Sequence, residues 1–304
     1  MTPLISIVVP NFNGKHLLKE CLDSIKNLHY DNYEVIVVDN SSTDGSGEMV
    51  MKQYPWAKLL VTEKIRIGQA CNRGMRLAEG DVIVTMLNND MTVDRHWLDH
   101  LIVPFRKKKV GIVGGKIHKY GSNLILSAGA MIDWDKGITF QVGRGEIDEG
   151  QFDKLREVDY VDVPTVKRDV MHAIGGIDEE YEHYYVDADY CIRAKRAGYK
   201  TVYVPRAVSW HRESSTIGAG TRRQYYCYYA DGIRFMIKYS TKRKTLGWIY
   251  HNVLMPNYLR VRRRERADLV GLSTKAMLWN LTKLYQTSKS GCYPQNSDQS
   301  CIES

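Results

Sequence analysis

The chain has 304 residues and a formal net charge of +8, with 43% hydrophobic and 26% charged residues. These proportions exclude a largely disordered protein, and no apolar run approaches the roughly 18 residues that cross a bilayer. The start of the chain lacks the basic region and cleavage site of a secretory signal, and the six cysteines form no CxxC pair. We therefore expect a cytoplasmic protein with one large domain and an appendage, without a zinc site or a disulfide framework.

Short apolar runs and amphipathic stretches alternate along the first 115 residues. Strands are predicted at Leu4–Val9, Glu34–Val38, Lys58–Val61, Val82–Leu87 and Val110–Val113. The intervening segments have helical patterns, which include residues 68–79 and Asp94–Lys108. Such short alternation predicts an α/β fold with a mostly parallel, twisted sheet that helices cover on both faces.

The rest of the chain consists of three segments that differ in composition and in predicted secondary structure. Residues 116–220 have a weaker, glycine-rich pattern at first, and then a predicted helix at Asp187–Ala197 and a strand at Thr201–Val204. Residues 221–288 are aromatic and basic and are expected to form a helical extension. Residues 289–304 are polar and are expected to be disordered.

Polar side chains follow three of the predicted strands, at Asn11, at Asp39 and at Asn88-Asn89-Asp90. Ligands of open α/β sheets bind at the carboxyl ends of the strands, so these side chains are expected to form one site. Asp39 is suited to accept a hydrogen bond from a nucleobase or ribose, and Asp90 is suited to hold a divalent cation. Each alone is equally suited to a turn or a helix cap.

Two later residues can return to the same edge of the sheet. Asp187 begins a predicted helix, where a carboxylate either caps the helix or takes a proton from an attacking hydroxyl. His211 follows the next strand, although a single histidine is more often structural than a ligand. The chain has no P-loop, no GxGxxG after its first strand and no GxSxG, which argues against P-loop NTPases and α/β-hydrolases.

Seven segments together resemble the family 2 glycosyltransferases, especially rhamnosyltransferase-like members. They are SIVVPNFNG (6–14), VIVVDNSSTDGS (35–46), CNRGMRLAEGD (71–81), LNND (87–90), IGGIDEEY (174–181), YYVDADYCIRAKRAGYKTVYVP (184–205) and SWHRESST (209–216). The resemblance covers roughly residues 4–240, in the order and spacing of the family. It implies a GT-A fold over residues 1–220, with a nucleotide-binding part at about 1–115 and an acceptor-side part at about 116–220.

The resemblance also implies an activity. A hexose or deoxyhexose would pass from a nucleoside-diphosphate sugar to a hydroxyl of a glycan or lipid-linked acceptor, with inversion, in cell-envelope polysaccharide synthesis. The donor nucleoside would lie against Pro10, Asn11 and Asp39, and its diphosphate near Arg73.

The resemblance also implies roles for the candidate metal ligands and for the candidate base. Asn88, Asn89 and Asp90 are similar to the family's variant of the Asp-x-Asp motif, so Asp90 would bind a Mg²⁺ or Mn²⁺ ion. His211 matches a histidine that completes the metal shell, and Asp187 matches the catalytic base.

Two stretches depart from the family pattern. Many relatives have Glu before the base, where this chain has Val186, which puts acceptor recognition in question. Relatives also have a small Ser-Gly-Ala stretch where this chain has VDVPTVKRDV (161–170), which puts the donor-sugar contacts in question.

The segment 242–266 has eight Lys or Arg residues and one acidic residue, Glu265, and apolar residues alternate with the basic ones. Such a segment either lies on an anionic membrane surface or forms a solvated helical cover for the core. Pro256 is expected to interrupt any single helix there. A peripheral enzyme at the cytoplasmic face of a membrane, acting on a lipid-linked acceptor, is one interpretation.

Three other functions are compatible with parts of the sequence. A nucleotidyltransferase would have a glycine-rich, Arg-containing loop after the first strand, where this chain has PNFNG. A non-catalytic relative that binds a nucleotide or glycan as a scaffold is favoured by Val186 and opposed by Asp90, Asp187 and His211. Nucleic-acid binding has only the positive charge in its favour, and we expect none.

Overall fold

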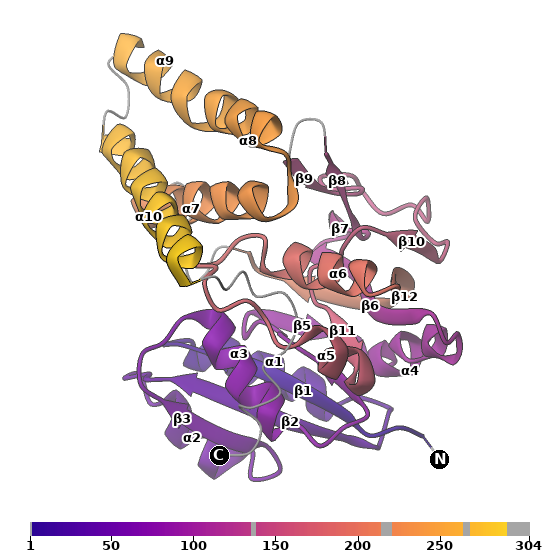
Figure 1. Cartoon of the computed structure of the whole chain (residues 1–304). Coiled ribbons are helices and arrows are strands. Elements are labelled where there is room, and N and C mark those ends of the chain that lie inside the picture. The colour runs from indigo at the N-terminus through magenta and orange to yellow at the C-terminus, as the bar shows by residue number, and fades with distance from the viewer. Residues whose placement is uncertain (1, 135–137, 214–220, 264–267, 291–304) are drawn as a thin grey trace. The chain divides into compact units, whose positions relative to one another are not determined.

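A computed structural model describes residues 2–134, 138–213, 221–263 and 268–290. The chain forms two compact units, Met1–Ala219 and Gly220–Ser304. The first unit is built on one large sheet, and the second unit consists of helices (Figure 1).

The large sheet of the first unit runs in the order β10-β12-β6-β11-β4-β1-β2-β3, with β5 added to β12 and β7 added to β6. Its strands are β1 (Ile5–Asn11), β2 (Tyr33–Asn40), β3 (Lys58–Thr62), β4 (Val82–Val84), β5 (Met91–Val93), β6 (Val110–Lys119), β7 (Ile125–Ser127), β10 (Arg156–Val158), β11 (Thr165–Lys167) and β12 (Lys200–His211). The neighbours β3, β2, β1 and β4 are parallel, as are β6 and β12, while β11 is antiparallel to both β4 and β6. A separate hairpin joins β8 (Ala130–Asp133) and β9 (Ile138–Gln141). The sheet is thus mostly parallel, as the sequence predicts.

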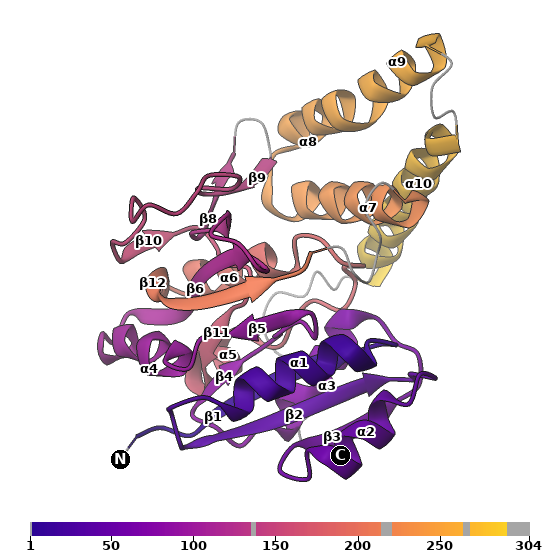
Figure 2. The same cartoon turned by 180° about the vertical axis from the view of Figure 1, so that it is seen from behind.

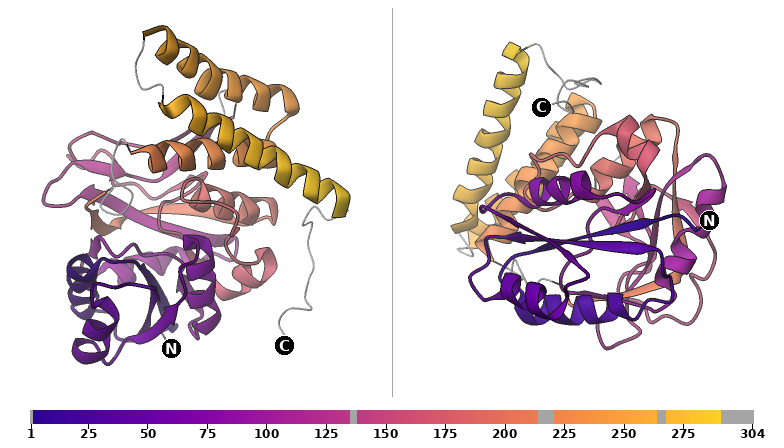
Figure 3. Two further views of the ribbon diagram at one scale, coloured as in Figure 1. Left: turned by 90° about the vertical axis from the view of Figure 1, so that its left-hand side faces the viewer. Right: turned by 90° about the horizontal axis from the view of Figure 1, so that it is seen from below.

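Helices cover both faces of the parallel part of the sheet. The helices of this unit are α1 (Lys15–Lys26), α2 (Ser46–Gln53), α3 (Ile67–Leu77), α4 (Trp97–Leu101), α5 (Arg168–Ile174) and α6 (Val186–Arg196). Ile7 of β1 packs in one core with Leu18 and Leu22 of α1. On the other face, Gly74 of α3 leaves no room for a side chain, because a Cβ there would lie 2.5 Å from Val8. Figure 2 shows α1 over one face, and the right-hand view of Figure 3 shows the sheet between its helical layers.

Two predicted elements are shorter in the structure. The helix predicted at Asp94–Lys108 is only α4 followed by a 3-10 turn at Val103–Arg106, because Pro104 has no N–H for a helical hydrogen bond. The strand predicted at Val82–Leu87 ends at Val84, and the residues after it form hydrogen bonds outside a regular ladder.

Two other strands are longer than the sequence predicts. β6 extends to Lys119, and β12 continues beyond Val204 to His211. The pairing of β12 with β6 shifts register between Val204 and Val208. Pro205 lies within this shift, where its lack of an N–H does not remove a hydrogen bond from the regular pairing.

The second unit contains α7 (Arg222–Tyr239), α8 (Lys242–Ile249), a π-helical turn (Tyr250–Leu254), α9 (Met255–Arg263) and α10 (Asp268–Ser290). Trp248 is buried against α7, where a Cβ on Gly232 would lie 2.4 Å from the indole ring. Pro256 does not interrupt the helix as predicted, because the chain stays helical from 242 to 263 and the wider π turn precedes the proline.

The predicted disordered tail, 289–304, begins inside α10, and its residues beyond 290 lie outside the described part. None of the helices that the structure describes combines the length and hydropathy of a membrane span. Cys21, Cys71, Cys191 and Cys227 are buried free thiols, in line with the packing roles that their spacing indicates.

Candidate active site

The ends of β1 and β2 hold a chain of buried polar side chains. The parallel register places Pro10 beside Val38 and Asn11 beside Asp39. The Asn11 amide nitrogen donates to Oδ1 of Asp39 at 2.9 Å, and the Ser42 hydroxyl donates to the same oxygen at 2.5 Å. Asn11 and Asp39 are 2% and 3% exposed, so their orientation is fixed by these bonds and not by solvent.

The chain of hydrogen bonds continues to the polar triplet after β4. The amide nitrogen of Asn89 donates to Oδ1 of Asn11 at 2.6 Å, so three strand ends are linked side chain to side chain. The backbone of Gly14 packs against Asn89 and leaves no room for a side chain at this position, because a Cβ there would lie 2.2 Å from the Asn89 amide nitrogen. Asn88 contributes through its backbone carbonyl, which accepts from Met91 N at 3.0 Å.

Asp90 and His211 form a pair at the same edge of the sheet. Oδ1 of Asp90 lies 3.0 Å from Nε2 of His211, and Asp90 is 7% exposed. The pair depends on the extension of β12, whose last residues pair antiparallel with β5 and set His211 opposite Met91. The backbone also joins them, since Arg212 N donates to Asp90 O at 3.2 Å.

These two side chains fit a divalent cation that also binds phosphate. An octahedral Mg²⁺-class ion with ligands at 2.0–2.1 Å has adjacent ligands about 3 Å apart, close to the Asp90–His211 separation. Among the described residues, no third His, Cys, Asp or Glu joins the pair to form a larger ligand group.

Four residues other than glycine have positive φ among the described residues, and three of them lie two residues after Asn11, Asp39 and His211 in the chain. Asn13 (47°) follows β1, Ser41 (61°) follows β2, Tyr185 (60°) precedes α6 and Glu213 (46°) follows β12. A left-handed backbone costs a residue with a side chain on the order of 1 kcal/mol or more, so it persists where surrounding contacts enforce it. Such strain gathers at binding and catalytic sites, which favours a ligand site here.

Asp187 lies in the first turn of α6, and its carboxyl group is unlike the others in the site. Burial, and then the negative charge of Asp162, raise the pKa of Asp187 well above its usual value. Asp162 itself accepts a hydrogen bond from the Gln141 amide at 3.1 Å. No described contact joins Asp187 to Asp90 or Asp39, so the structure gives two groups of polar residues and not one cluster.

Arg73 is the one predicted donor-site residue that points to another partner. Its guanidinium makes two hydrogen bonds to the Glu63 carboxylate, at 3.0 and 2.6 Å. The Arg73 side chain is 35% exposed.

Sequence analysis missed the residues that hold the loop before α6. The Asn72 amide nitrogen donates to Ile177 O and to Glu179, both at 2.8 Å, and its oxygen accepts from Ile177 N at 2.8 Å. Arg193 binds Asp189 at 2.9 Å and the carbonyl oxygens of Ile174 and Gly176. Asn72 and Asp189 are in the segments that resemble the family, but nothing in their spacing distinguishes a loop anchor from a ligand.

Comparisons with known proteins relate the first half of the chain to one family of enzymes. Residues 6–151 match the family model described as "Glycosyl transferase family 2". Glycosyltransferase GlyG of Streptococcus pneumoniae is 36% identical over 124 residues, which are 40% of this chain and 41% of that protein. These matches support a family 2 glycosyltransferase.

The other relatives extend the comparison beyond the matched segment. The Sinorhizobium fredii protein y4gI is 27% identical over 287 residues, which are 88% of this glycosyltransferase-like chain and 30% of that protein. The chain therefore spans less than half the length of either curated relative. Mannosyltransferase PcManGT from Pyrobaculum calidifontis, solved in complex with GDP-Man and Mn²⁺, has a TM-score of 0.57 at 19% identity, over 97% of this chain and 77% of that one. The fold is thus that of the GT-A glycosyltransferases.

Proposed function

We propose that this protein transfers a hexose or deoxyhexose from a nucleoside-diphosphate sugar to a hydroxyl group, with inversion at the anomeric carbon. The observation that carries the proposal is the linked set Asp39–Asn11–Asn89, which is followed directly by the Asp90–His211 pair. One edge of the sheet thus holds hydrogen-bonding groups that suit a nucleoside. Next to them lies a carboxylate–imidazole pair that suits a cation. The GDP-Man and Mn²⁺ bound to PcManGT support this use of a GT-A edge.

On the donor side, Pro10, Asn11 and Asp39 would contact the nucleoside. Oδ1 of Asp39 accepts from the Asn11 amide and the Ser42 hydroxyl, whereas Oδ2 accepts only the longer bond from Ser42 N at 3.3 Å and would have a further acceptor position for a ligand. Arg73 would turn from Glu63 to the diphosphate. Asn88 and Asn89 would line the donor between these groups.

Asp90 and His211 would hold the divalent ion, Mg²⁺ or Mn²⁺. When bound, such an ion neutralises the negative charge that develops on a departing nucleoside diphosphate. The two side chains would hold the ion, and the residues around α6 would act on the sugar and the acceptor.

Asp187 would accept the proton of the acceptor hydroxyl as that oxygen forms the bond to the anomeric carbon and the bond to the diphosphate breaks. A carboxylate with a raised pKa is a stronger base once ionised, and a base works best when its pKa approaches the working pH. A single displacement inverts the anomeric centre. General-base assistance contributes on the order of a hundred- to ten-thousand-fold in rate.

The acceptor would be a glycan or a lipid-linked glycan at the cytoplasmic face of a membrane. An exposed apolar row along the helix 242–263 supports this, formed by Leu246 (66% exposed), Tyr250 (47%), Leu254 (50%) and Tyr258 (60%). The basic residues of the same segment give the charge that attracts anionic lipids. Flotation with anionic vesicles at low salt, lost in a Leu246→Ser/Tyr258→Ser variant, is the expected result; equal partition of both proteins at all salt concentrations contradicts it.

A scaffold without catalysis is the competing proposal. Val186, in the place where many relatives have Glu, is buried in α6 and offers no polar group to an acceptor. The raised pKa of the partly buried Asp187 supports the enzyme, because carboxyl groups with strongly shifted pKa values gather at catalytic sites.

A thermal-shift screen tests the donor site first. The wild type and an Asp90→Asn variant are measured with UDP, dTDP, GDP and CDP, with and without Mn²⁺. A ligand at 100 times its dissociation constant adds about 2.7 kcal/mol to stability, so one nucleotide should raise the wild-type melting temperature by several degrees only with Mn²⁺. Stabilisation without Mn²⁺ contradicts the metal role, and stabilisation by none of the four points to a scaffold with a different ligand.

A further inference from the structure

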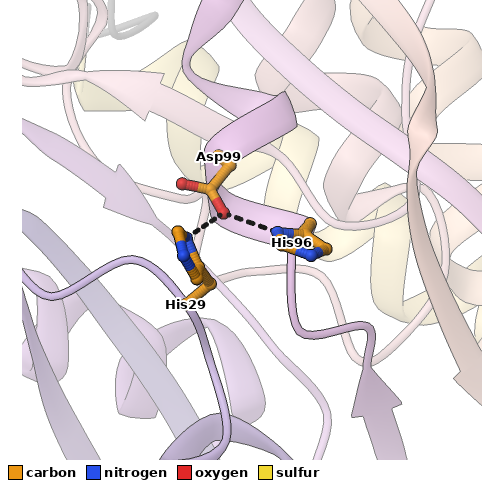
Figure 4. A group of neighbouring side chains, drawn as sticks. All are labelled: His29, His96 and Asp99. Carbon is orange, nitrogen blue, oxygen red and sulfur yellow. Dashed lines mark hydrogen bonds and ion pairs between the residues drawn. The ribbon is translucent and has the colours of Figure 1, made fainter.

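Two histidines and an aspartate form a compact group outside the candidate active site. His29 lies in the loop between α1 and β2, and His96 and Asp99 lie at the start of α4 (Figure 4). The loop precedes β2, whereas Asp39 is near the end of that strand, about 20 Å away along six residues of β structure. Neither Asp90 nor His211 belongs to this group, since Asp90 precedes β5 whereas His96 and Asp99 follow that strand.

Both imidazole rings point a nitrogen at the same carboxylate oxygen. Oδ2 of Asp99 lies 3.4 Å from Nδ1 of His29 and 3.2 Å from Nδ1 of His96. The potential ligand atoms of all three residues lie within 4.8 Å of one another. Among the described residues, this is the one group of three or more such side chains with that spacing.

His96 Nδ1 is hydrogen-bonded to Oδ2 of Asp99, and the two distances also fit a shared metal ion. An N–H···O bond spans about 2.7–3.2 Å, so the His96 contact is at the upper limit and the His29 contact is beyond it. A tetrahedral zinc site has ligands at about 2.0–2.1 Å, which places neighbouring ligand atoms about 3.3 Å apart. The observed 3.4 and 3.2 Å lie on either side of that separation.

The backbone around the group holds the ligands in place without a metal. His29 N donates to Arg95 O at 2.7 Å, which ties the loop to the residue before His96. His96 N donates to Oδ1 of Asp94 at 2.8 Å, and the neighbouring Trp97 is buried with 2% exposure. An ion would therefore meet a preformed site and would not have to order a loose segment.

We propose that His29, His96 and Asp99 bind one divalent transition ion of the zinc class. Imidazole nitrogens select zinc, cobalt or nickel over magnesium and calcium, which take oxygen ligands. The side chains of His29, His96 and Asp99 are 61%, 44% and 31% exposed, so water has access to the fourth position. The ion would clip the α1–β2 loop to α4 and stabilise the first unit without taking part in sugar transfer.

The test uses Co²⁺ and Zn²⁺ with the full-length protein, prepared without a histidine tag and without nucleotide. Tetrahedral Co²⁺ absorbs visible light strongly, so titration should give one equivalent with this absorption, and Zn²⁺ should displace it. The variants His29→Gln and His96→Gln should each weaken binding at least about tenfold and lose the Zn²⁺-dependent rise in melting temperature. The matched control is His16→Gln, an exposed histidine of α1 that pairs with Glu20 and lies outside the group.

The Asp90→Asn variant separates this site from the donor site, because it should keep the full tetrahedral Co²⁺ absorption even if it loses an ion at the Asp90–His211 pair. The proposal is overturned if wild type shows no tetrahedral Co²⁺ spectrum, if His29→Gln and His96→Gln bind as wild type does, or if only Asp90→Asn loses that absorption. Metal-free melting temperatures within about 2 °C of wild type show that the variants fold, as expected for changes at half-exposed surface residues.

Discussion

Asn11 and Asp39 end two parallel strands side by side, and the amide of Asn11 donates to the carboxylate of Asp39 at 2.9 Å. The same amide group accepts from Asn89 at 2.6 Å, so Asn11 is the middle of a buried three-residue link. One side chain therefore supports both the proposed nucleoside contact and the polar triplet that leads to Asp90.

Substitution of Asn11 by Ala should weaken the site and the fold together. It removes a donor to a buried carboxylate and leaves the Asn89 amide without its acceptor, a change that costs about 1–3 kcal/mol of unfolding free energy. Urea denaturation measures this loss. The control Asn32→Ala removes an exposed amide that donates to Thr2 O, and should change stability by less than about 0.5 kcal/mol. Equal losses of unfolding free energy in both variants would show that the buried hydrogen bonds of Asn11 stabilise the protein no more than the exposed hydrogen bond of Asn32.

The Gly14→Ala substitution tests the contact between Asn89 and Asn11 without removing either side chain. The added Cβ would collide with the buried terminal amide of Asn89, so we expect a loss in stability of about 1–3 kcal/mol. Displacement of that amide breaks the bond from Asn89 to Asn11, so nucleotide-dependent stabilisation should fall severalfold. Gly247→Ala, in an open place on α8, is the control and should be neutral or slightly stabilising. Wild-type nucleotide affinity in Gly14→Ala would show that Asn89 does not line the donor.

The parallel half of the sheet could be predicted from sequence because buried parallel strands are continuous apolar runs. The same pattern puts Asn11 and Asp39 at adjacent strand ends, and the structure joins them directly. The roles of these residues toward a donor remain proposals, since what the residues contact in the protein does not name a ligand.

The short distance between Asp90 and His211 could not be predicted from a local residue pattern. Pro205 predicts the end of a strand, yet β12 continues past it through a register shift and brings His211 to β5. The influence of Asp162 on Asp187 is likewise absent from any local pattern, because the two residues are 25 positions apart. Long-range contacts of this kind depend on packing and not on periodicity.

Removal of the Asp162 charge should shift the pH dependence of transfer. If Asp187 is the base that we propose, protonation as the pH falls through its raised pKa would stop transfer and set the acid limb of kcat/KM. Asp162→Asn removes the second cause of the rise, so the acid limb should move to lower pH. Asp159→Asn, which instead loses an ion pair with Lys195, is the control and should leave the limb in place. A limb that stays fixed or moves to higher pH in Asp162→Asn would rule out this coupling.

The Asp187→Asn substitution should lower the activity and raise the stability of the protein. Asn cannot accept the proton of the acceptor hydroxyl, so kcat should fall on the order of a hundred- to ten-thousand-fold while nucleotide affinity stays within about twofold. Folding raises the pKa of this carboxyl group, so its ionised form destabilises the native state at any pH above the unfolded pKa of about 3.9. Asn carries no charge there, and the variant should melt at a higher temperature than wild type at neutral pH.

The pH dependence of this stability gain is the discriminating measurement. The gain should be largest above the raised pKa, shrink as the pH falls and disappear below about pH 3.9, where the carboxyl group is neutral in both states. Melting curves of Asp187→Asn and wild type across that range provide the comparison, with Asp159→Asn as the control for loss of a paired carboxylate. A variant that is inactive but less stable at neutral pH would indicate that Asp187 caps and holds α6. A variant that is inactive and more stable would identify it as a strained catalytic base.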